Sequence, residues 1–414
     1  MSERSDADSI AQMIRSWLAD NWDDHLGLVE WRERLVNSGW AVPSWPVEWF
    51  GRGLPAAADK VVADEIRAFG AIATPLGAGM SLAAPTMMAH GSDELRSRLL
   101  RPTLTGAVTW TQLFSEPGAG SDLAGLTTTA VRDGDDWIVN GQKVWNTSAH
   151  HADYGMLVAR TDWDAPKHRG ISYFVVPMDQ PGIEVRPILQ MNRHSSFNEV
   201  FFSDARIPAA NLVGDAGDGW RVARTTLMHE RTFTTLRRPS FPAQRGRTVE
   251  EAAAEAAAHF ATYVWYPQRA GRADLLVGRA GEHGRDGDPT VRDDIARINS
   301  MQRVSEWTAQ RAQAARALGR PPGPEGSLGK LAASRLARAS ASAHTRIAAA
   351  HGMLAGDLED QTAAVIAEVL VSTPAQSIAG GTDEIQHNII GENILGMPRE
   401  PTTDRDIAFR DVRR

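Results

Sequence analysis

The sequence predicts a multidomain α+β protein in which helices precede and follow a β-domain. Residues 1–108 carry apolar side chains at helical spacing, residues 109–214 fall into short alternating runs separated by turns, and residues 215–414 return to helical spacing. The chain of 414 residues is also long enough for two or three domains. We therefore expect an N-terminal helical domain, a middle antiparallel β-domain and a C-terminal helical domain.

The N-terminal part is predicted to contain only helices. Ser92 precedes a charged run and is a good helix N-cap, because its hydroxyl can accept from a free backbone N–H of the first turn. Six of the thirteen tryptophans lie in the first fifty residues, and we expect them to pack between helices. Helices are expected at residues 5–21, 29–38, 56–69 and 93–100.

The middle part has the β-branched, alternating composition of strands. Turn signals at Asp133-Gly134-Asp135 and Asn140-Gly141 separate neighbouring runs. Pro208 and Gly214 close the region. Strands are expected at residues 109–114, 127–131, 137–139, 155–160, 171–176, 182–188 and 198–207.

After Gly219 the helical period returns. The run Arg320-Pro321-Pro322-Gly323-Pro324 is a break that no helix can cross, because proline lacks the N–H and clashes with the preceding turn. Helices are expected at residues 220–236, 249–263, 288–318, 327–354, 358–371 and 383–396.

Composition excludes several classes of function. The net charge of −7 argues against a nucleic-acid-binding protein, which normally carries a basic excess. The absence of cysteine removes disulfides, thiolate metal sites and cysteine nucleophiles. The N-terminus lacks the apolar core of a signal peptide, and no run of eighteen apolar residues predicts a membrane span. We expect a cytoplasmic protein.

Two segments carry the strongest functional signal. Residues 114–122 read FSEPGAGSD, a glycine-rich loop whose backbone N–H groups can approach a negatively charged or electron-rich ligand. Residues 140–147 read NGQKVWNT and place a large flat aromatic beside a hydroxyl at the end of a strand. The pair of segments at this spacing is far more specific than either alone.

Because it contains these two segments, the chain resembles the acyl-CoA dehydrogenase family of flavoproteins, in its actinobacterial branch. The resemblance also includes the strand at 198–208, the His229-Glu230-Arg231 tract and the segment GTDEIQ at 381–386. It implies a helical domain at 1–108, a β-barrel-like domain at 109–214 and a four-helix bundle within 215–414. It also implies FAD bound between the β-domain and the bundle.

The implied reaction removes a proton from Cα and a hydride from Cβ of an acyl-CoA thioester, with flavin N5 as hydride acceptor. Many family members carry the catalytic carboxylate just before the C-terminal Gly-Thr, but Gly380 occupies that place here. A second group carries it before an arginine on the helix after the β-domain, which points to Glu230. The alternative is a solvated helix residue. No metal is expected, because His229-Glu230 lacks the second histidine of HExxH and His150-His151 lacks companion ligands.

The resemblance also assigns cofactor and substrate contacts. Typical members carry an Arg-x-x-Phe-Gly segment whose arginine reaches the cofactor of a neighbouring subunit. In this chain the resemblance assigns that role to Arg285, and the phenylalanine of the segment is missing. Each residue has an ordinary structural alternative, such as core packing for the aromatics. The implied FAD contacts are Gln112, Phe114, Ser115, Gly120, Ser121, Trp145, Thr147, Arg285 and Thr382, and the implied substrate contacts are Ser121 and Arg231.

Partners follow from the same resemblance. We expect an acyl-CoA substrate, an electron-transfer flavoprotein or similar acceptor, and a homo- or hetero-oligomer, with no nucleic acid and no membrane span. Two alternatives remain open at this point. One is a partner subunit of a mixed assembly that does not hold its own FAD or contributes half a site, and the other is a flavin oxidase or monooxygenase of the same fold.

Overall fold

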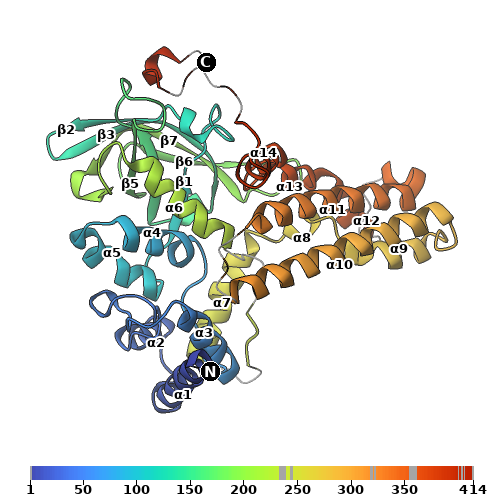
Figure 1. Ribbon diagram of the computed structural model, residues 1–414, viewed down its shortest axis with the longest axis horizontal. Coiled ribbons are helices and arrows are strands. Elements are labelled where there is room, and N and C mark those ends of the chain that lie inside the picture. Colours follow the sequence, from blue (N-terminus) through green and yellow to red (C-terminus); the bar gives the residue numbers. More distant parts are fainter. Residues whose placement is uncertain are drawn as a thin grey trace. The chain divides into compact units, whose positions relative to one another are not determined.

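The computed structural model describes residues 2–232, 239–242, 246–317, 320, 323–353, 361–399, 401, 404 and 406–412. Two compact units divide the chain. The first contains residues 1–188, 196–263 and 403–414, and the second contains residues 189–195 and 264–402. The element order is helices, strands and helices, as the sequence predicts (Figure 1).

Five α-helices begin the first unit. Ser92 is the N-cap of the fifth and accepts a hydrogen bond from Leu95 N at 3.1 Å, and Gly106 ends that helix in the left-handed conformation at φ 79°. A π-helical turn at Gly79–Ala83 leads directly into the fourth. The helices are α1 (Ser2–Asn21), α2 (Leu28–Asn37), α3 (Ala57–Phe69), α4 (Ala84–His90) and α5 (Asp93–Thr105).

The N-terminal tryptophans pack between these helices, as predicted. Trp31 is fully buried, and the rings of Trp17 and Trp22 lie 5.7 Å and 4.6 Å from its ring. Helix α7 (Arg247–Ala261) packs into the same core through Val249 and Ala252, and the buried Arg32 of α2 donates to Glu255 of α7 at 2.6 Å. Helix α7, the second helix after the β-domain, therefore packs against the N-terminal helices.

The β-domain is one eight-stranded sheet with the order β6-β7-β3-β2-β4-β5-β8, and β1 pairs with β4. Most pairings are antiparallel, but β1–β4 and β2–β4 run parallel, which the sequence did not predict. The strands are β1 (Trp110–Leu113), β2 (Thr129–Asp133), β3 (Asp136–Thr147), β4 (Tyr154–Arg160), β5 (Ile171–Pro177), β6 (Ile183–Ile188), β7 (Phe197–Pro208) and β8 (Leu212–Val213).

The expected turn at Asn140-Gly141 is wrong. Strand β3 runs through it for twelve residues, with a register shift against β7 between Val139 and Gly141. Gly141 has φ 150°, and a Cβ there would lie 2.5 Å from Thr128 Oγ1. Glycine is therefore required by close approach within a bulge, not by a reversal of the chain.

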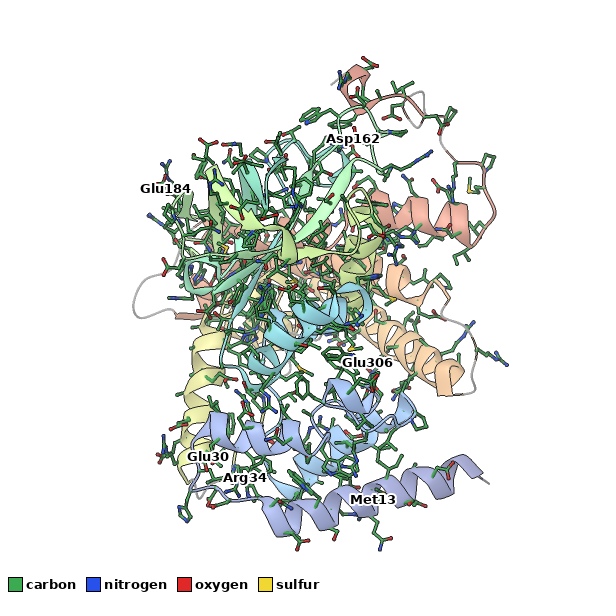
Figure 2. All side chains as sticks on the ribbon, turned by 90° about the vertical axis from the view of Figure 1, so that its left-hand side faces the viewer. Met13, Glu30, Arg34, Asp162, Glu184 and Glu306 are labelled. Atoms are coloured by element: carbon green, nitrogen blue, oxygen red, sulfur yellow. The ribbon has the colours of Figure 1, made fainter. Side chains whose placement is uncertain are left out.

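Two cores hold the β-domain. One is formed by residues on the sheet itself, including Leu157, Phe174 and Val200, all fully buried. The other joins the sheet to α4, α5 and α6 (Gly219–Thr232) through residues such as Val222 and Tyr173. This second core fixes helix α6 against the sheet. Figure 2 shows Glu184 of β6 and Asp162 of the β4–β5 connection at the surface of this domain.

The second unit is helical, and its elements pack on each other through two small apolar cores. One stretch of the described chain, residues 362–393, is long and apolar enough by composition to cross a membrane. The structure divides it into three helices of at most twelve residues, whereas a span needs about twenty. The helices are α8 (Tyr266–Arg269), α9 (Leu276–Glu282), α10 (Pro289–Ala317), α11 (Glu325–Ala348), α12 (Gln361–Ser372), α13 (Pro374–Ile378) and α14 (Asp383–Asn393).

Candidate active site

A buried ion pair anchors the glycine loop (residues 115–122). Lys143 of β3 is fully buried, and its Nζ donates to Glu116 Oε1 at 2.8 Å and to the Phe114 carbonyl at 3.0 Å. Glu116 also accepts from the backbone N–H groups of Thr127 and Thr128, at 2.7 Å and 2.9 Å, and from the Thr127 hydroxyl at 2.9 Å. The start of the loop is thus tied to β3 and to residues 127–128, which follow the loop in the chain.

The electrostatics of this pair keep it ionised near neutral pH. Burial raises the pKa of Glu116, but attraction to Lys143 and hydrogen bonds from Lys143, Thr128 and Thr127 outweigh burial and lower that pKa to about 2. Burial lowers the pKa of Lys143 to about 8, against the opposing attraction of Glu116. Both Glu116 and Lys143 are therefore charged at pH values between these two pKa values.

This ion pair predicts an acid-sensitive stability. A carboxyl whose folded pKa is depressed contributes stability above its unfolded pKa and loses that contribution as the pH falls toward the folded pKa. For Glu116, a fall from 4.5 to about 2 corresponds to a loss on the order of 3 kcal/mol as the pH falls through that window. Thermal unfolding between about pH 5 and 3 should show a steeper loss for the wild type than for Glu116→Gln. Equal slopes would contradict the assignment.

The tip of the loop is open on its outer side. Glu116 and Ala119 pair with each other across it through both backbone N–H groups. Gly118 and Gly120 have ordinary negative φ, and a Cβ at either would meet nothing within 4 Å. Ser121 is exposed beside them. The tip therefore offers accessible backbone and a hydroxyl to a ligand.

Trp145 has an unusual conformation for a large residue. It lies in β3 at a second register shift against β7, its φ is +63°, and 57% of the residue is exposed. A non-glycine residue in this region is uncommon and marks a functional constraint or strain. The ring contacts Phe197 edge-to-face at 5.9 Å. The bulge thus presents an indole to the outside of the sheet instead of burying it.

Glu230 lies near the end of α6 and is half-buried. Its Oε2 accepts a hydrogen bond from Gln112 Nε2 of β1 at 3.2 Å. One turn earlier, the buried Thr226 hydroxyl contacts the Tyr173 hydroxyl at 3.1 Å and the Thr86 hydroxyl at 2.9 Å. The helix that carries Glu230 is thereby tied to β5 and α4, so that the carboxylate has a fixed position beside β1.

The residues that flank Glu230 in the sequence differ in their exposure. Leu227 is half-buried, but Met228 is more than half exposed, and Phe233 lies outside the described residues. Burial lowers the pKa of His229. Arg231 lies in the last turn of α6, and its side chain is outside the described part of the chain.

The structure brings together the predicted residues on β1 and β3. The Asn146 side chain donates to the Gln112 carbonyl at 2.7 Å, and Thr111 Oγ1 donates to the Thr147 carbonyl at 3.0 Å. Val144 N donates to the Ser115 carbonyl at 2.9 Å. Phe114 is buried against Tyr173, with ring centroids 5.9 Å apart. The ends of β1 and β3, the glycine loop and Glu230 therefore belong to one unit.

Two predicted cofactor residues belong to the second unit and have local partners there. Arg285 donates to Asp288 at 2.6 Å, and its Nη1 donates to the Arg346 carbonyl at 3.4 Å. Thr382 is the N-cap of α14 and accepts from Ile385 N at 3.2 Å. Gly380 has φ +67°, a conformation that favours glycine over the glutamate found there in much of the family.

Sequence reasoning missed the role of Lys143 and Glu116, although both lie in its two motifs. The available signal was a lysine at a core-facing position of a strand, which demands a buried partner. Among the described residues, no cluster of three or more histidine, aspartate or glutamate side chains could hold a metal ion.

The comparisons identify the family. The sequence patterns of the N-terminal, middle and C-terminal domains of acyl-CoA dehydrogenases match residues 6–107, 111–205 and 246–395. The chain belongs to the acyl-CoA dehydrogenase family of lipid metabolism and is an oxidoreductase of that class. The family is in general FAD-dependent.

Individual relatives agree with this placement. The chain is 34% identical to the acyl-CoA dehydrogenase IpdE1 of Mycobacterium tuberculosis, over 95% of this chain and 99% of that protein. The Tcur3481-Tcur3483 steroid acyl-CoA dehydrogenase superposes with a TM-score of 0.65 and 25% identity, covering 96% of this chain and 98% of that one. The ChsE4-ChsE5 complex of M. tuberculosis gives 0.63 and 26%, covering 95% and 98%.

Proposed function

We propose that this chain catalyses FAD-dependent α,β-dehydrogenation of an acyl-CoA thioester with Glu230 as the base. The observation that supports the proposal most is the half-buried Glu230 carboxylate, held 3.2 Å from Gln112 Nε2 beside the ends of β1 and β3. A carboxylate held in a fixed position can accept a proton from a substrate carbon placed next to it.

The residues of the first unit suit a flavin. Trp145 offers an exposed flat ring, and Ser115 and Thr147 lie half-buried on the adjoining segments. The open glycine-loop tip offers backbone and the Ser121 hydroxyl to a pyrophosphate or to the substrate. When bound, FAD supplies the acceptor for the hydride that leaves Cβ. We also propose contacts of Phe114, Gln112 and Gly120 with the flavin edge or the pyrophosphate.

In this mechanism the protein positions the thioester and removes one proton. Glu230 accepts the α-proton on a carboxylate oxygen, and Gln112 holds that carboxylate through its amide N–H. Position 380 is a glycine and has no carboxylate to accept a proton, so Glu230 is the proposed base of the site. Arg285 and Thr382 are proposed as contacts to FAD from a helical unit, and Arg231 as a substrate contact. An electron-transfer flavoprotein or similar acceptor then removes the electrons, in a cytoplasmic setting.

The purified protein tests this proposal directly. We expect a yellow protein whose flavin absorption band bleaches under anaerobic conditions on addition of an acyl-CoA from a panel of chain lengths and steroid side chains, with enoyl-CoA as product. A protein that binds flavin but leaves every acyl-CoA unchanged would contradict the activity. Stoichiometric hydrogen peroxide in air would instead identify an oxidase.

A second candidate function is a partner subunit of a mixed assembly. Two solved relatives, the Tcur3481-Tcur3483 steroid acyl-CoA dehydrogenase and the ChsE4-ChsE5 complex, are each named for two different chains, which favours this possibility. The local pairing of Arg285 with Asp288 also leaves that guanidinium engaged within its own turn. A colourless protein that acquires flavin only when co-expressed with a second acyl-CoA dehydrogenase chain would support this candidate.

Trp145 provides a test of the flavin platform. We expect Trp145→Ala to weaken FAD binding by about fivefold or more, because loss of one aromatic stacking contact costs about 1–3 kcal/mol. Trp145→Phe should retain most of the affinity. The dissociation constant of FAD, measured by flavin fluorescence after reconstitution, checks both. Equal affinity in the alanine variant and the wild type would show that the indole does not contact the flavin.

A further inference from the structure

The end of the chain folds back onto the connection between β4 and β5 (residues 161–170). Phe409 N donates to the Ala165 carbonyl at 3.1 Å, and Arg410 N donates to the Trp163 carbonyl at 3.0 Å. The Phe409 side chain is only 2% exposed and lies 5.4 Å from the Trp163 ring. Figure 2 places Asp162 of this connection near the returning C-terminal segment (red). We call residues 404–412 the tail.

Phe409 covers a buried cation. The guanidinium carbon of Arg160, the last residue of β4, lies 3.4 Å from the centroid of the Phe409 ring. Arg160 is fully buried, and it donates to the carbonyls of Ala124 at 2.7 Å and Leu126 at 3.2 Å. A buried guanidinium needs acceptors for its N–H groups, so these hydrogen bonds fix both the Arg160 side chain and the backbone that carries the two carbonyls. The tail therefore contacts the same group that fixes residues 124–126.

A second link joins the tail to the glycine loop. The mostly buried Lys167 places its Nζ 2.5 Å from Asp122 and 3.5 Å from Asp404 of the tail. The Lys167 carbonyl accepts from Arg160 Nη1 at 3.0 Å, so the two links are joined to each other at the β4–β5 connection. The last residue of the loop and the stretch that follows it are thereby held from the same side.

We propose that the tail is a clamp that holds residues 121–126, and that Phe409 is a positioning residue for the glycine loop. The Phe409 ring excludes water from Arg160, which strengthens the hydrogen bonds from Arg160 to the two carbonyls. Without the ring, water reaches the guanidinium and competes for its donors. The consequence for substrate rests on the proposed function: a loosened Ser121 and glycine loop bind acyl-CoA more weakly, while Glu230 is unaffected.

Hydrogen exchange tests the clamp without any activity. The amides of Gly125 and Leu126 donate to the carbonyls of Asp122 and Leu123, so their exchange reports opening of this stretch. In Phe409→Ala we expect exchange of residues 121–126 to be about tenfold faster, with rescue toward the wild-type rate in Phe409→Leu. Ile407→Ala, at an exposed tail position, is the matched control and should leave the rate unchanged.

Lys167→Met is the second variant, and it keeps the proposal testable if Phe409→Ala does not fold. It removes the ion pair with Asp122 and leaves Phe409 in place, so faster exchange is expected at Gly125, whose amide donates to the Asp122 carbonyl. Unchanged exchange at 121–126 in whichever variants fold would overturn the clamp, as would equal exchange in Phe409→Ala and Phe409→Leu.

Steady-state kinetics test the consequence for substrate. Phe409→Ala should raise KM for acyl-CoA by about fivefold or more while kcat stays within about twofold, because binding is weakened and the base is not. A fivefold or larger fall in kcat with an unchanged KM would overturn the positioning role. If the wild type oxidises no acyl-CoA, the proposed function fails, whereas the exchange result still decides whether the tail holds the loop.

Discussion

Glu230→Gln is expected to lower kcat by about 10² to 10⁴-fold, the range that positioned general bases contribute. Glutamine has nearly the same shape, and its side-chain oxygen can still accept the hydrogen bond that Gln112 donates to Glu230 at 3.2 Å. It cannot take a proton from a carbon acid at neutral pH. Single-turnover reduction of the bound flavin by acyl-CoA measures the effect at the chemical step.

Binding should survive this substitution. FAD content and the dissociation constant for acyl-CoA should remain within about threefold of the wild-type values, because the variant loses a charge but keeps the side-chain volume and the hydrogen bond. Glu30→Gln, at an exposed position of α2 labelled in Figure 2, is the matched control and should have wild-type rates. A Glu230→Gln protein that reduces flavin at a near-normal rate would remove Glu230 from the mechanism.

Lys143→Met is expected to destabilise the protein by about 3–5 kcal/mol, the cost of leaving one member of a buried ion pair without its partner. Glu116 is 5% exposed at its side chain and would keep a carboxylate with no cation beside it. The glycine loop would also lose the contact between Lys143 Nζ and the Phe114 carbonyl. We expect a lower unfolding temperature and loss of FAD on purification.

A double substitution separates charge from packing. Lys143→Met combined with Glu116→Gln removes both charges, so it should recover part of the stability lost in Lys143→Met alone. Lys60→Met, at an exposed position of α3, is the control and should shift the unfolding temperature by little. If the double variant were less stable than Lys143→Met by the full cost of Glu116→Gln, the two side chains would not be coupled.

The sequence predicted the elements whose signals are local. Ser92 caps α5 because its hydroxyl reaches an N–H three residues on, and β4 and β5 are buried apolar runs bounded by turns. The same kind of local signal gave a wrong prediction at Asn140-Gly141, because this dipeptide, which is typical of turns, occupies a bulge inside a long strand. The domain limits at 108 and 214 stay a prediction.

The candidate site was predictable only in part, because long-range pairings are absent from local patterns. The resemblance indicated Glu230, but nothing in the sequence shows that Gln112, 118 residues earlier, donates to it. Lys143 stands in a recognisable motif, yet its partner Glu116 lies on another segment. The tail has no periodicity at all, and its role depends on Phe409 covering Arg160.

Removal of the α-proton is the central claim, and isotope exchange measures it most directly. A thioester analogue with sulfur in place of the β-carbon cannot give up a hydride, so it isolates the proton step. Incubated in deuterium oxide with the FAD-loaded wild type, the analogue should gain deuterium at Cα, detected by mass spectrometry, and with Glu230→Gln it should gain essentially none. Exchange at the wild-type rate in Glu230→Gln, with the analogue shown to bind, would contradict the account.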